Sequence, residues 1–185
     1  MKSAKSFFSA LLLMLICTGC VLTPRDDVRI AHYDLAIPAK VKSYDQINVA
    51  QVDNSSPAQS RMLYRMKGNR MINDNANYWI QPPDRMLQRY FEQAFQVAGN
   101  HHSKNKIDLR CSINTFEFDI ANSEAVLSLK YTMRSNMQRC TGNLLIREKF
   151  TSREPIALAA AMDRAAAGAV IQLELAAQKF FNKKQ

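Results

Sequence analysis

The sequence predicts a single α+β domain, in which an antiparallel sheet carries two amphipathic helices packed on one face. The chain has 185 residues, and domains commonly contain roughly 100 to 200. Two segments repeat apolar residues at three- and four-residue steps, and several others repeat them at every second residue. Short polar segments join the last three alternating runs, which favours hairpins. Helices that segregate from strands in this order are typical of the α+β class.

The composition excludes several classes of protein. Hydrophobic residues make up 47% of the chain and charged residues 22%, so the chain is not wholly disordered. Four cysteines are too few for a disulfide-stapled scaffold. The 25 Lys and Arg residues exceed the 16 Asp and Glu residues by nine, and such an excess favours anionic partners.

The N-terminus has the layout of a bacterial lipoprotein leader. Two lysines precede an apolar segment over 7–16, which is too short to span a membrane. Small residues then lead directly to Cys20, as in the lipobox, where this cysteine receives fatty-acyl chains. We therefore predict a signal peptide over 1–19 and lipidation at Cys20, since several acyl chains hold a protein stably on a bilayer. The alternative is plain secretion with cleavage near Gly19.

The segment after Cys20 predicts where the domain resides. Val21 follows the cysteine in place of Asp, which resembles the outer-membrane sorting signal of Gram-negative lipoproteins. Residues 20–32 are polar and contain a proline, so we expect a tether there and a single domain over 33–185. The predicted location is the outer membrane, with the lipid-anchored domain facing the periplasm.

The first half of the domain is expected to contain short strands, a hairpin and one helix. The hairpin turns at Lys67-Gly68-Asn69, a turn-like sequence. Pro83 suits the first position of a helix that Gly99 and Asn100 would end. The expected segments are strands over 33–37 and 46–52, the hairpin over 61–72 and the helix over 82–98.

The second half is expected to form a meander followed by a long helix. Apolar residues alternate over 107–118, 125–134 and 141–151, which predicts three antiparallel strands. An Ala-rich helix follows over 155–181, beginning at a proline.

Cys111 and Cys140 are the cysteines left for a disulfide once Cys20 is acylated. A strand between them would hold them ~9–10 Å apart, beyond the reach of a bridge. The bond therefore requires the third strand of the meander to pair directly with the first, or a bulge near Cys140. The alternative is two separate thiols that pack as small hydrophobic side chains.

Catalytic signatures are weak, and we expect no enzyme, no cofactor and no metal site. His101 and His102 are adjacent and lack the spacing or the cysteine partners of a zinc site. The sequence contains no glycine-rich phosphate loop and no nucleophile elbow. Glu117 and Asp119 could do acid–base chemistry as a pair, but a solvated strand face explains them more simply.

The predicted hairpin has a basic face beside aromatic residues. Arg61, Arg65, Lys67 and Arg70 lie near Tyr64 and near a later Tyr-Trp pair. A periplasmic lipoprotein meets little nucleic acid, so we expect none as a partner. Anionic lipid headgroups or an acidic protein surface are the expected targets, and the alternative is a solvated face without a ligand.

Four short motifs resemble the ABC-type transport auxiliary lipoprotein family, whose members are PqiC-like. They are Met62–Arg65 (MLYR), Tyr78–Pro83 (YWIQPP) before an amphipathic helix, Thr115–Glu117 (TFE) and Tyr33–Leu35 (YDL). The resemblance covers most of residues 33–181. The cysteine pair and the strong positive charge are not features expected across that family.

The resemblance implies a non-enzymatic periplasmic subunit that works with an MCE-domain protein and an ABC transporter in lipid transport. The implied mechanism is docking to the MCE partner, with Tyr64, Arg65 and Trp79 as candidate interface residues. Alternatively, Trp79 packs the helix entry onto the core. A homo-oligomer is compatible with the sequence, and the competing function is a scaffold or pilot lipoprotein of a secretion or pilus machine.

Overall fold

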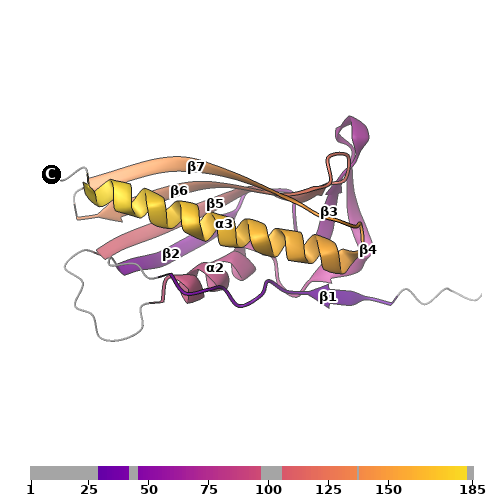
Figure 1. The fold of residues 1–185 in the computed structure, drawn as a ribbon, viewed down its shortest axis with the longest axis horizontal. Helices are drawn as coiled ribbons and strands as arrows, with labels where there is room; N and C mark the ends of the chain where they lie inside the picture. Colours follow the sequence, from indigo (N-terminus) through magenta and orange to yellow (C-terminus); the bar gives the residue numbers. More distant parts are fainter. Residues whose placement is uncertain (1–28, 42–45, 97–105, 137, 183–185) are drawn as a thin grey trace, which may run out of the picture.

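The computed structural model describes residues 29–41, 46–96, 106–136 and 138–182. Figure 1 shows an elongated molecule in which a long helix lies along a curved sheet. The elements are β1 (Ala31–Tyr33), β2 (Gln46–Asn54), β3 (Arg61–Arg65), the 3₁₀ turn η1 (Lys67–Asn69), β4 (Met71–Trp79), α2 (Pro83–Ala94), β5 (Lys106–Asp119), β6 (Glu124–Ser135), β7 (Gln138–Lys149) and α3 (Pro155–Asn182).

The seven strands form one mixed sheet, so the prediction of a purely antiparallel sheet is wrong. The antiparallel meander β5–β6–β7 is confirmed. The other edge of β5 is shared, since β2 pairs with its first half and β3 with its last two residues, both in parallel. The alternation of apolar residues indicates on which face of the sheet a side chain lies, but not whether the adjacent strand is parallel or antiparallel. The long connection from β2 through the hairpin and α2 allows the parallel pairing.

Both helices pack on the same face of the sheet, as predicted. α2 contacts β2, and α3 lies across β6 and β7 while touching α2. α3 is long and apolar enough to cross a membrane, but half of its most apolar stretch is buried inside the domain. This is the pattern of a core helix.

The helix α2 ends at Ala94, four residues before the predicted end at Ala98. The backbone N–H of Val41 donates to the carbonyl oxygen of Ala94 at 3.0 Å. The segment before β2 therefore supplies a partner for a carbonyl that a longer helix would have used internally. The predicted cap at Gly99 and Asn100 lies outside the described residues.

The boundary between tether and domain lies earlier than predicted. Ala31 and His32, placed in the tether, form β1 together with Tyr33, and β1 pairs in parallel with β4. The predicted strand over 33–37 contributes only its first residue. The predicted signal peptide, the lipidated Cys20 and the rest of the tether up to residue 28 lie outside the described residues.

Cys111 and Cys140 are not joined by a disulfide, so the structure corresponds to the alternative of two separate cysteines. The strand β6 lies between the two cysteines. Tyr131 is the register partner of Cys111 on one side and of Gly142 on the other. The third strand of the meander does not pair with the first, and the register between β6 and β7 is regular at Cys140, so neither condition for a bridge is met.

Candidate functional site

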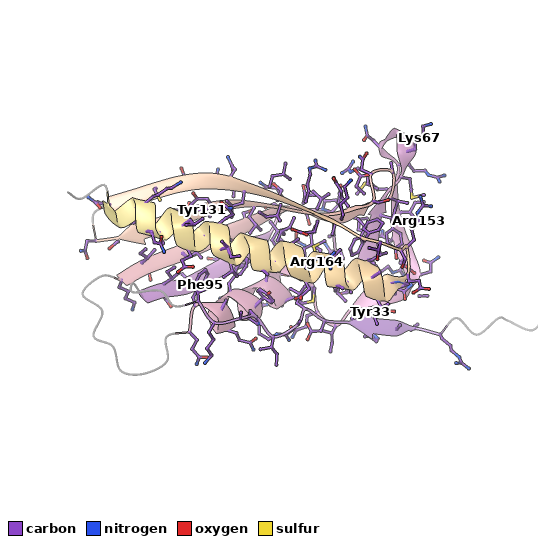
Figure 2. The ribbon with its side chains drawn as sticks, in the orientation of Figure 1. Tyr33, Lys67, Phe95, Tyr131, Arg153 and Arg164 are labelled. Atoms are coloured by element: carbon purple, nitrogen blue, oxygen red, sulfur yellow. The ribbon has the colours of Figure 1, made fainter. Side chains whose placement is uncertain are left out.

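The hairpin β3–η1–β4 stands at one end of the molecule, with Lys67 near its tip (Figures 1 and 2). Its tight turn depends on Gly68 and Asn69, whose φ angles are +74° and +61°. Glycine and asparagine tolerate this left-handed conformation better than other residues. The predicted hairpin is therefore confirmed, although β4 continues to Trp79, beyond the predicted end at residue 72.

Tyr64 points into a hydrogen-bond cluster centred on Asp74. The Tyr64 hydroxyl donates to Asp74 Oδ2. The same carboxylate accepts from the backbone N–H groups of Ala76 at 2.7 Å and Asn77 at 3.0 Å, and from Asn77 Nδ2 at 2.8 Å. Burial alone would raise the pKa of Asp74, but these hydrogen bonds outweigh it and hold the pKa below its ordinary value. Asp74 therefore stabilises the hairpin as a carboxylate.

Arg65 forms a two-pronged ion pair with Glu117 of β5. Its Nε and Nη2 atoms donate to the two carboxylate oxygens, with Nη2 2.9 Å from Oε2. Glu117 is only 4% exposed, so the expectation of a solvated strand face is wrong for it. A carboxylate can be buried here because the arginine satisfies both of its oxygens.

Asp119, the other half of the predicted carboxylate pair, is also buried. It accepts hydrogen bonds from the backbone N–H of Asn122 at 3.0 Å and from Asn122 Nδ2 at 2.8 Å. These bonds close the turn between β5 and β6. Both carboxylates thus hold the structure at the end of β5, and neither faces open solvent.

Trp79 lies in the core with 2% of its surface exposed. Its ring meets Phe116 edge-on at a centroid distance of 5.3 Å and stacks on Phe118 at 6.1 Å. It precedes the helix α2, so it packs the helix entry onto the sheet. This arrangement matches the packing alternative and leaves little of Trp79 for direct contact with a partner.

Tyr64, Arg65 and Trp79 thus come together around the end of β5, as the sequence motifs suggested. They do so through inward contacts with Asp74, Glu117 and the two phenylalanines. Asp74 was not among the predicted site residues, although the polar run NDNAN inside a strand was a visible signal. The contacts of these three residues hold the hairpin on the sheet.

The described part of the chain contains neither a metal-binding group nor an unpartnered buried polar side chain. No three His, Cys, Asp or Glu side chains gather among them as a metal-binding group would. Every buried side-chain nitrogen and oxygen in the described ranges has a hydrogen-bond partner. A cavity of about 270 Å³ lies between residues 34–37 and α2, and its cation, Arg89, is already bound by Asp34 and Gln81.

The fold and this hairpin define a small α+β domain with a helix-covered face and an open sheet face, and solved structures of the same kind exist. One is protein XCC0632 from Xanthomonas campestris, described with the family DUF330. It is similar at a TM-score of 0.63 with 18% identity, over 84% of this chain and 99% of that chain. An uncharacterized protein is similar at a TM-score of 0.65 with 14% identity, over 79% and 97% of the two chains.

The likeness therefore concerns the fold and spans nearly the whole of both solved chains. No family model matches the sequence. No curated protein matches it either.

Proposed function

We propose that this protein is an accessory lipoprotein of an MCE/ABC-type lipid transport system, anchored in the outer membrane and facing the periplasm. The observation that carries the proposal is the shared fold with a DUF330 protein over 84% of this chain, combined with the lipobox that ends at Cys20. The short motifs that resemble those of PqiC-like lipoproteins also support it.

The proposed role is docking rather than catalysis. The anchor restricts the domain to the bilayer surface, which raises its effective concentration for a partner and lets a modest interface suffice. The buried carboxylates are engaged by Arg65 and Asn122, which supports a structural role for the groups that would otherwise suggest acid–base chemistry.

The test is affinity purification of the full-length protein from detergent-solubilised cell envelopes. We expect an MCE-domain protein to be recovered with it. Recovery of an outer-membrane secretin instead would favour the scaffold or pilot function. Recovery of neither, while other envelope complexes survive the same detergent, would contradict the proposal.

The anchor has its own test. We expect Cys20→Ser to move the protein out of the outer-membrane fraction, since the acyl chains supply the stable attachment. Intact-mass analysis of the native protein should show the acyl modification. An unmodified thiol at Cys20 would remove the anchor from the proposal.

A further inference from the structure

Five cations gather on the open face of the sheet, at the end where β5 begins. Leu109, Leu129 and Met133 point into the core, so their neighbours along each strand point to the opposite, open face. The members are exposed and come from three adjacent strands. This outer-face cluster comprises Lys106, Arg110, Lys130, Arg134 and Arg139.

The register of the strands places like charges against each other. Arg134 of β6 is directly opposite Arg139 of β7. Residues in this relation have Cβ atoms about 4.5–5.5 Å apart, and like charges there are destabilising. Thr132 lies between the cations, because it is opposite Arg110 on β5 and Thr141 on β7.

The outer-face cluster is not neutralised within the described part of the chain. None of its members forms an ion pair there, although Arg110 donates to Gln51 at 3.3 Å. Two carboxylates lie at the same end of this face, Asp53 and Asp108, and Asp108 is the register partner of Arg134 on β5. Each accepts from a side-chain amide, Asp108 from Asn48 at 2.8 Å and Asp53 from Gln51 at 2.7 Å. Five cations against two carboxylates leave a net positive surface.

The cluster lies at the end of the sheet opposite to the tether. β1 follows the tether and belongs to the group β1–β4–β3, which joins β5 only at Phe118 and Asp119. The start of β5 lies at the other end of the sheet. Arg110 is about 30 Å from Asp119 along the strand, at ~3.3 Å per residue. Eight residues lie between Cys20 and Arg29, and the nine residue-to-residue steps reach at most about 30 Å. A lipid anchor at Cys20 therefore connects to the hairpin end of the domain, and the cluster lies at the opposite end of the sheet.

We infer that the outer-face cluster is the docking surface for an acidic region of a periplasmic protein partner. This inference rests on the proposed function and adds to it the surface and the charge of the partner. An exposed sheet face with an excess of cations complements a carboxylate-rich surface, and such complementarity increases the rate and specificity of association. The position of the cluster, far from the end at which the tether enters the domain, favours a protein partner, and lipid headgroups are the competing outcome of the second experiment.

The first experiment measures binding of poly-L-glutamate to the full-length lipoprotein in neutral detergent micelles. The variant Arg134→Glu/Arg139→Glu should weaken binding about tenfold at low salt. The matched control Lys67→Glu/Arg70→Glu changes the net charge by the same amount on exposed residues of the hairpin, and should weaken it less than twofold. Equal weakening by both variants would mean that only net charge matters and would overturn the inference.

The second experiment places a photo-cross-linking amino acid at Thr141, an exposed residue beside the cations. In cells we expect a cross-link to the MCE-domain protein that co-purifies with the wild type, and its loss in the Arg134→Glu/Arg139→Glu variant. A cross-link to phospholipid alone would overturn the inference in favour of a membrane contact.

The two proposals fail in different ways. If the MCE protein is recovered equally with both charge variants, the proposed function stands and the docking surface is wrong. If it is never recovered, the proposed function fails, and the poly-L-glutamate comparison still decides whether this face selects acidic chains.

Discussion

The hairpin end and the outer face of the sheet are both rich in charge, but they handle it differently. At the hairpin end, Arg65 is paired with Glu117, and Asp74 is held by four hydrogen bonds. On the outer face, Arg134 opposes Arg139 without an ion pair to either in the described residues. Satisfied polar groups hold a structure together, whereas uncompensated cations remain available to a partner.

This difference reverses the simplest interpretation of the sequence. The motif residues Tyr64, Arg65 and Trp79 attract attention as a binding site, yet their contacts are internal. The cations of the outer-face cluster form no motif, since they are spread over three strands. The changes below should therefore affect stability at the hairpin end and affect binding, with little loss of stability, on the outer face.

The largest effect is expected for Trp79→Ala. Removing a fully buried aromatic ring commonly lowers the free energy of unfolding by about 3–5 kcal/mol, and Trp79 supports both Phe116 and Phe118. Denaturant unfolding measures it, with Trp79→Phe as the milder control. A loss below about 1 kcal/mol would show that the hairpin end is not integrated in the core.

The next effect is expected for Glu117→Gln. The amide keeps the shape but loses the charge that Arg65 neutralises, so we expect a loss of about 1–3 kcal/mol. Asp53→Asn is the matched control, because Asp53 is an exposed carboxylate, and it should change stability by less than about 0.5 kcal/mol. Similar losses for both variants would contradict the contrast between the two regions.

A smaller, pH-dependent effect is expected for Tyr64→Phe. The change removes one donor to Asp74 and should cost about 1 kcal/mol at neutral pH. The pKa of Asp74 is lowered on folding from its ordinary 3.8, so its stabilisation is present above that value and is lost as the pH falls below it. The stability difference between wild type and variant should therefore shrink below pH 4, as measured by urea unfolding. A difference that persists unchanged at low pH would assign the effect to packing.

The smallest effect has the opposite sign and is expected for Arg139→Glu. The change gives Arg134 a carboxylate as its cross-strand partner in place of a second arginine. This should raise the free energy of unfolding by a few tenths of a kcal/mol to about 1 kcal/mol. The gain should diminish with added salt, because exposed charges are screened. Thermal unfolding at low and high salt measures it, and Arg139→Gln should give about half of the gain. A destabilised Arg139→Glu protein would show that the two arginines do not repel each other.

Local signals in the sequence predicted much of the fold. Pro83 and Pro155 marked the starts of both helices, and alternation located the meander. The end of α2 was predicted too late because Val41, more than 50 positions before Ala94, provides the partner that ends it. The contacts of the candidate site also depend on residues far apart in the sequence, since the bond between Arg65 and Glu117 joins residues 52 positions apart.

The sequence by itself determined which faces are apolar, because burial imposes a period of two on strands and of 3.6 on helices. It also determined the excess of positive charge and the order of the elements. Only the tertiary structure decided that β2 and β3 run parallel to β5, that Glu117 is buried against Arg65, and that Arg134 opposes Arg139. These outcomes depend on strand pairing between distant segments, and a repeating pattern along one strand does not identify which strand lies beside it or in which direction that strand runs.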